Sequence, residues 1–220
     1  VYQVLWMRRF THVMGSGSVS VSVVIAAFMG GLFLGAVLLR RVLGRCRNEL
    51  RWYAVLEAVI GLWGLLFVWS FPHLGGIYAW LSGGAGAGVA GLAAKATSSM
   101  LWMLLPTAAM GATLPLMVQF LERRGRGFGD AIGLLYAVNA AGGATGALLA
   151  GFVLIEFVGI DNSLLLVAGL NLAVALSAWW LASILVVPPP EPPASVGSAS
   201  EAPARPLLVA AFASGLAAIG

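Results

Sequence analysis

The chain has 220 residues, of which 60% are hydrophobic and only 9% are charged, with a formal net charge of +4. A soluble domain has roughly a quarter of its residues charged, so this composition excludes a water-soluble globular protein and predicts an integral membrane protein. The basic residues, all arginine except Lys95, lie mostly in short clusters between apolar runs. This distribution follows the positive-inside rule of membrane proteins and argues against a nucleic-acid-binding surface.

Apolar runs long enough to cross a bilayer follow one another along the chain. The sequence begins at Val1, inside what we predict to be a first helix, and stops within the apolar run 207–220. That last run has about 14 residues and is too short to span, so we expect a fragment of a longer membrane protein. The complete predicted spans are 18–39, 52–74, 97–121, 131–155 and 163–187.

The weakly hydrophobic segment 77–94 decides the predicted topology, because it lies between two arginine-rich loops, 40–51 and 122–130. If this segment crossed the membrane, the two loops would lie on opposite sides, against the positive-inside rule. We therefore predict two crossings between the loops, with 77–94 a re-entrant or periplasmic excursion. Both basic loops are then cytoplasmic, as is the Pro/Ser/Ala-rich linker 188–206, whose composition is typical of an extended or disordered segment.

Aromatic residues favour the membrane–water interface. Trp52 and Tyr53 are therefore predicted at one interface, and Trp69 and Phe71 near the other. The lone Cys46 excludes an intrachain disulfide and is predicted to be a reduced, cytoplasm-facing thiol.

Counting the first helix, residues 1–187 contain six predicted spans, followed by the linker and, from 207 to 220, the start of a seventh. Six spans, a linker and further spans are the plan of one half of a twelve-helix transporter whose halves are parallel repeats. The predicted fold is all-α, a polytopic helical bundle of this kind.

Pairs of small residues predict where these helices pack. Gly31 and Gly35 are four residues apart, as are Gly142 and Gly146, and such spacing lets two backbones approach closely in lipid. The pairs form either fixed packing contacts or seams along which helices slide.

Pro106 and Pro115 lie in one predicted span, where each removes a backbone hydrogen bond and bends the helix. Thr107 and Thr113 are predicted to bond the freed carbonyls. The bends are either structural kinks or hinges for gating.

Glu57 is the one acidic residue inside a predicted span. A carboxylate within the membrane is a candidate for binding substrate or coupling a proton, because its placement there is costly. The alternative is an ion pair with an arginine at the membrane edge, such as Arg40 or Arg41. Asn139 and Asn171 lie in the middle of later spans, and such amides more often connect helices than bind ligands.

No catalytic residue, cofactor site or metal site is predicted in this chain. Residues 86–91 match the GxGxxG pattern of dinucleotide-binding proteins, but no acidic residue lies between Glu57 and Glu122 to bind a ribose. His12 and His73 are too far apart in sequence to suggest a metal or catalytic pair.

Four sequence blocks carry a resemblance to a known family. They are YQVLWMRR (2–9), VIAAFMGGLFLG (24–35), PTAAMGATLPLM (106–117) and LLYAVNAAGGATGALLAGF (134–152). The chain resembles, over nearly its whole length, the membrane domain of the bacterial fused proteins that join a major-facilitator-like helical domain to a spermidine-synthase-like domain. The blocks at 106–117 and 134–152 are the most specific.

The resemblance implies candidate substrate or coupling residues. Arg8 matches an arginine of the family's first helix, Gln3 stands where the family often has glutamate, and Glu57 matches an acid that follows the family's basic loop. With Asn139, these are the candidate residues of the chain. Residues 214–220 resemble the beginning of the same helix motif in the second half.

The resemblance also implies that an aminopropyltransferase-like activity could belong to the parent protein. None of that catalytic apparatus is present here, since Asp130 and Asp161 are the only aspartates and both lie at predicted helix ends.

Three functions therefore stay open. The chain is the membrane domain of a spermidine-synthase-like fusion that anchors the enzyme or serves polyamine metabolism or transport, or half of a secondary transporter without an enzyme, or a non-transporting scaffold. The expected location is the bacterial plasma membrane. The expected partners are the lipid bilayer, the other half of the bundle and a C-terminal soluble domain, with no nucleic acid and no cofactor.

Overall fold

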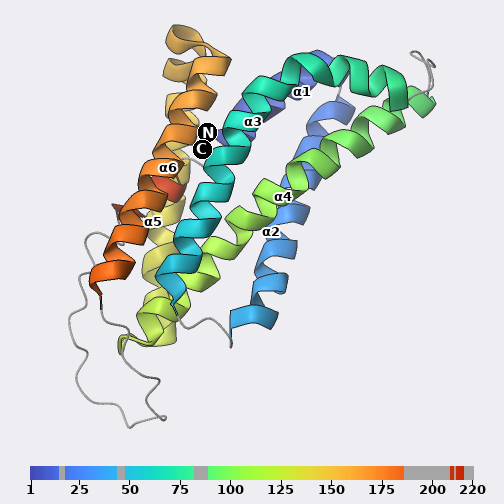
Figure 1. Ribbon diagram of the computed structural model, residues 1–220. Helices are drawn as coiled ribbons and strands as arrows, with labels where there is room; N and C mark the ends of the chain where they lie inside the picture. Colours follow the sequence, from blue (N-terminus) through green and yellow to red (C-terminus); the bar gives the residue numbers. More distant parts are fainter. Residues whose placement is uncertain (15–17, 44–47, 82–88, 186–208, 211, 216–220) are drawn as a thin grey trace.

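The computed structural model describes the chain except for residues 15–17, 44–47, 82–88, 186–208, 211 and 216–220. The described residues form helices and no strands, which confirms the all-α prediction (Figure 1). The α-helices are α1 (Tyr2–Met14), α2 (Ser18–Leu43), α3 (Glu49–Leu81), α4 (Val89–Glu122), α5 (Phe128–Leu149) and α6 (Ile160–Ile184), and a π-helical stretch, η1 (Ala150–Val158), continues α5. Residues 209, 210 and 212–215 are also helical, and we call them the C-terminal segment.

Five of the described helices are long and apolar enough to cross a membrane. Helix α1, with 13 residues, is not among them. By length and composition these five helices are therefore candidates to span a membrane. The candidate spans are Ser20–Arg41, Glu49–Phe71, Ala93–Glu122, Phe128–Val158 and Ile160–Ile184.

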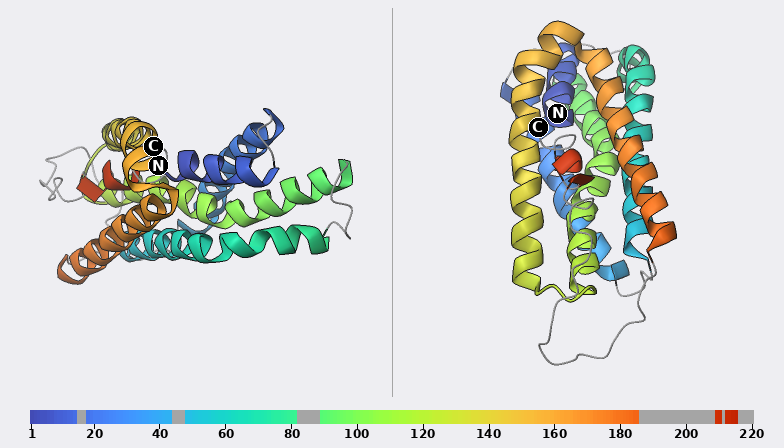
Figure 2. Two further views of the ribbon diagram at one scale, coloured as in Figure 1. Left: turned by 90° about the horizontal axis from the view of Figure 1, so that it is seen from above. Right: turned by 90° about the vertical axis from the view of Figure 1, so that its left-hand side faces the viewer.

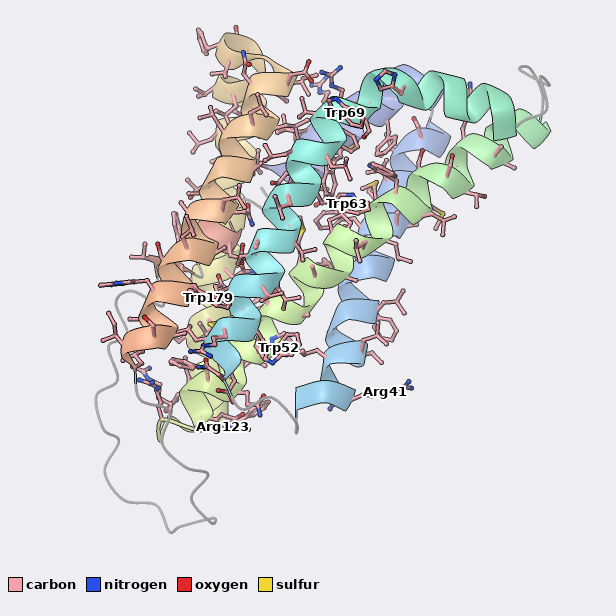
Figure 3. The ribbon with its side chains drawn as sticks, in the orientation of Figure 1. Arg41, Trp52, Trp63, Trp69, Arg123 and Trp179 are labelled. Atoms are coloured by element: carbon pink, nitrogen blue, oxygen red, sulfur yellow. The ribbon has the colours of Figure 1, made fainter. Side chains whose placement is uncertain are left out.

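Helices α3 and α4 are longer than the predicted spans and absorb most of the segment 77–94. Residues 77–81 end α3 and residues 89–94 begin α4, so the described part of this segment is helical. All of it before Ala93 lies outside the candidate spans, and its place relative to the membrane stays a prediction. Because α3 and α4 run in opposite directions, the start of α3 and the end of α4 lie at the same end of the bundle. Arg41, near the end of α2, and Arg123, just after α4, both lie at this end (Figure 3). We call this the arginine end.

The aromatic residues at the start of α3 divide between two faces. Trp52 has 49% of its surface exposed, whereas Tyr53 has only 1%. Successive residues of a helix point about 100° apart, so one of the pair faces outward and the other faces the bundle. Tyr53 therefore does not face lipid, contrary to its predicted place in an interfacial pair. Trp69, near the other end of α3, is 71% exposed (Figure 3).

Helix α2 packs mainly on α4, and their closest approach is at glycine residues of both helices. A Cβ atom on Gly35 would overlap the carbonyl oxygen of Ala108, and a Cβ on Gly111 would overlap the backbone of Leu32. Gly31 faces Thr107 in the same way. This seam is the close backbone contact that glycine permits between helices in lipid. Gly142 and Gly146, the second predicted pair, are buried in α5.

Helix α4 contains both Pro106 and Pro115. The threonine hydroxyls do not bond the carbonyls that these prolines free, which belong to the residues four positions earlier. Thr107 donates to Met103 at 2.6 Å, and Thr113 donates to Met110 at 2.7 Å. The carbonyl freed by Pro106 is that of Trp102, and it accepts a 3.1 Å hydrogen bond from the indole Nε1 of Trp63 in α3. The donor that replaces the lost backbone N–H thus comes from a neighbouring helix.

The buried apolar residues form two clusters along the bundle. On α3, Tyr53 and Ala54 belong to the cluster nearer the arginine end, and Ile60 belongs to the other cluster. Glu57 lies between them in sequence and is completely buried. The fold therefore places a carboxylate between two apolar cores.

Candidate functional site

The carboxylate of Glu57 is bonded to helix α6. Asn171 donates from its Nδ2 atom to Oε2 of Glu57 at 2.6 Å, and Asn171 is 2% exposed. The close approach of α3 and α6 depends on Gly61, one turn after Glu57, because a Cβ there would lie 2.9 Å from the Leu172 side chain and 3.0 Å from the Ala168 carbonyl oxygen. Asn171 thus does connect two helices, and its partner is the acid in the span.

Hydroxyl groups approach Glu57 from the other side. Tyr53, one turn earlier on α3, and Ser214, from the C-terminal segment, both interact with the carboxylate. The Tyr53 hydroxyl donates its one hydrogen to the carbonyl oxygen of Ala210 at 3.3 Å, so it joins α3 to the C-terminal segment. Figure 2 shows this segment between α5 and the neighbouring helices, with Ser214 buried and Val209 69% exposed. Residues 157 positions apart are therefore brought to one site.

Two oxygen atoms of the site lack a hydrogen-bond donor. Among the described residues, neither Oε1 of Glu57 nor Oδ1 of Asn171 has a partner, although both are buried. The orientation of the Asn171 amide is fixed by its neighbour, because only the NH₂ group can donate to a carboxylate oxygen. The amide oxygen is therefore the atom left free. Buried polar atoms are nearly always bonded in native proteins, so these two acceptors on bonded neighbours are candidates for binding a ligand or a water molecule.

A small hollow of about 10 Å³ adjoins these groups. Tyr53 and Ser214 line it together with Asn139 of α5, Thr113 of α4 and three apolar side chains. A volume of this size holds about one water-sized group. The backbone carbonyl of Asn139 also lies against Gly215, where a Cβ would not fit. Residues of α3, α4, α5 and the C-terminal segment thus line the hollow.

The structure separates the candidate residues named from the sequence. Asn139 shares the hollow with Tyr53, which interacts with Glu57, so Asn139 belongs to the site. Arg8 of α1 is exposed and Gln3 is half-buried, and neither is bonded to the site in the described residues. Arg40 and Arg41, the predicted alternative partners of Glu57, are exposed. The polar groups that interact with Glu57 in the described residues are all uncharged.

Two ion pairs lie away from the site. Arg123 binds the buried Glu49 at 2.7 Å and joins the ends of α4 and α3 at the arginine end. Arg9 of α1 pairs with Asp161, the second residue of α6. The guanidinium of Arg9 also lies over the ring of Phe71, 4.9 Å from its centroid. Glu49 and Asp161, near the beginnings of α3 and α6, are thus paired with arginines, whereas the partners of Glu57 are uncharged.

An aromatic cluster fills the bundle between Glu57 and the Arg9–Asp161 pair. Tyr2 and Trp6 of α1 have ring centroids 5.0 Å apart, and Trp6 lies 5.6 Å from Phe67 of α3. Phe10 continues the contacts to Phe67 and Phe71. The hollow, by contrast, lies on the arginine-end side, among residues near Tyr53.

Sequence reasoning missed two residues of the site. Tyr53 was predicted at the interface because, from the sequence, a tyrosine near the end of a span looks the same whether it faces the lipid or the bundle. Ser214 was noted only as part of a segment that resembles a helix motif. Nothing in the neighbouring sequence predicts that it lies near Glu57. Within the described residues no group of three His, Cys, Asp or Glu side chains could hold a metal ion. Of the GxGxxG match, residues 89–91 are helical and residues 86–88 lie outside the described residues.

Comparison with known protein families, curated proteins and solved structures gave no match to this chain.

Proposed function

We propose that this chain is the membrane domain of a transport protein, forming the first half of a major-facilitator-like bundle, with Glu57 as its substrate-binding or coupling carboxylate. The observation that carries the proposal is the complete burial of Glu57 in a spanning helix beside uncharged partners only. A carboxylate in this position is costly and is retained in membrane proteins chiefly for function. A purely structural acid would gain more from an arginine, as Glu49 does.

The resemblance of the four sequence blocks directs the proposal to polyamine-related transport in a spermidine-synthase-like fusion of the bacterial plasma membrane. A polyamine carries several ammonium groups, and a buried carboxylate is a suitable partner for one of them. The arginine end is then cytoplasmic by the positive-inside rule. In this proposal any aminopropyltransferase-like chemistry belongs to another part of the parent protein. Sequencing the gene beyond the segment that encodes this chain tests whether such a part exists.

The test is uptake of labelled spermidine into proteoliposomes that contain the whole parent protein, because half of such a bundle is not expected to transport by itself. Glu57→Gln is expected to lower uptake at least about tenfold, because it removes the charge and keeps the shape. Glu122→Gln is the matched control, since Glu122 is an exposed acid at the arginine end. Uptake no greater than that of empty vesicles would reject transport and favour the anchoring or scaffolding function.

A further inference from the structure

The free oxygens at Glu57 and Asn171 define the chemistry of a ligand. Both atoms are oxygens, and neither accepts a hydrogen bond of normal geometry from the described residues, although the hydroxyls of Tyr53 and Ser214 lie near the carboxylate. A ligand that satisfies both must itself be positively charged or rich in N–H groups. An anion or an acceptor-only group would leave the carboxylate unpaired.

The charge of the site limits the charge of the ligand. Glu57 is the single acid of the cluster, and the other contributors, Asn171, Tyr53 and Ser214, are neutral. A divalent cation would leave one positive charge uncompensated between two apolar cores, which is strongly unfavourable. A monovalent cation leaves the site neutral.

The size of the site limits the ligand further. Glu57 and Asn171 do not line the hollow of about 10 Å³, which reaches them only through Tyr53 and Ser214, so the space beside the two oxygens is no larger than about one water molecule. The lining of the hollow is mostly apolar, although Thr113, Asn139, Tyr53 and Ser214 are among the residues that line it. Oxygen ligands suit hard cations, and they equally accept the hydrogen bonds of an ammonium group.

We propose that Glu57 and Asn171 bind one small monovalent cation, an alkali-metal ion or a single ammonium group, with Ser214 of the C-terminal segment completing the site. The site is therefore shared between the helices that precede the linker and the segment that follows it. This inference rests on the proposed function only in taking Glu57 as the functional carboxylate. It concerns binding and does not require transport.

The test measures protection of Glu57 from dicyclohexylcarbodiimide, an apolar reagent that modifies buried carboxyl groups, on the detergent-solubilised protein. Modification of the Glu57 peptide is followed by mass spectrometry at constant pH and ionic strength, in Na⁺, K⁺ or methylammonium against the bulky N-methylglucamine cation. We expect protection by at least one of the small cations. Protection by Na⁺ or K⁺ alone identifies an alkali-ion site, and protection by methylammonium alone identifies an ammonium site.

Variants assign the protection to the proposed ligands. Asn171→Leu and Ser214→Ala are each expected to weaken it about tenfold or more, and Ser214→Ala removes a single oxygen with little risk to folding. Asn162→Ala is the matched control, because Asn162 is an exposed amide on the same helix. No protection by any small cation would overturn the proposal, as would protection unchanged in both ligand variants. Protection without spermidine uptake would keep the cation site and reject the transport function.

Discussion

The indole Nε1 of Trp63 donates a 3.1 Å hydrogen bond to the carbonyl oxygen of Trp102, the group that Pro106 leaves without its helical donor. The two indole rings also lie 5.0 Å apart. The carbonyl that Pro106 frees in α4 is thus bonded by a side chain of α3. This hydrogen bond fixes the position of the two helices relative to each other at this point.

This relationship predicts a coupling between Trp63 and Pro106. Trp63→Phe removes the donor and keeps an aromatic ring, and we expect it to lower the free energy of unfolding by about 1–2 kcal/mol. In a Pro106→Ala background residue 106 regains its N–H group, so the same substitution is expected to cost less. A double-mutant cycle of unfolding in detergent measures the difference. Equal costs in both backgrounds would contradict the assigned hydrogen bond.

The α2–α4 seam predicts opposite outcomes at two glycines of one helix. Gly35→Ala places a methyl group in the backbone of α4 at Ala108, so the helices must separate. Gly30→Ala meets no atom within 4 Å. We expect the first variant to lose about 1–3 kcal/mol of stability through overpacking, and the second to gain up to about 1 kcal/mol from the higher helix propensity of alanine. Thermal denaturation in detergent compares them. Equal melting temperatures would argue against this seam.

The Glu49–Arg123 pair predicts a strong effect at the arginine end. The Glu49 side chain is 3% exposed and that of Arg123 is 33% exposed, so Arg123→Gln leaves a buried carboxylate without its partner. Breaking a buried pair costs about 3–5 kcal/mol, and partial exposure of Arg123 reduces the expected cost to about half of that. Arg126→Gln, in the same loop, is the control. A loss of stability no greater than that of the control would show that the pair is not maintained.

The proposed orientation predicts which thiols can be reached in intact cells. Cys46, which lies outside the described residues between α2 and α3, should resist an impermeant thiol reagent because the arginine end is cytoplasmic. Glu156→Cys in a Cys46→Ser background should be labelled, since Glu156 is exposed on η1, near the opposite end. Labelling of Cys46 alone would reverse the orientation.

Much of the helical architecture could be predicted from the sequence, because each span in lipid needs an apolar run of fixed length. The runs around Gly31 and Pro106 located helices correctly, although α3 extends two turns beyond the predicted end at residue 74. The extension has little sequence signal, since residues 75–81 are less apolar but still compatible with helix.

The site could be predicted only in part. Glu57 stood out because a charge in a span is rare. Its partner could not be found in the same way, because Asn171 is 114 residues away and one amide in an apolar helix resembles any other.

The sequence by itself predicted long apolar helices, the main candidate spans, and two arginine-rich loops for which the positive-inside rule predicts an even number of crossings between them. These features depend on local hydrophobicity and charge. Only the tertiary structure decided that Tyr53 faces inward while Trp52 faces outward. It also decided that Asn171 rather than an arginine bonds Glu57, and that Trp63 donates to the carbonyl freed by Pro106. The physical reason is that lipid-facing and buried surfaces of a spanning helix are both apolar, so the pattern of hydrophobic residues does not show which face meets a neighbour.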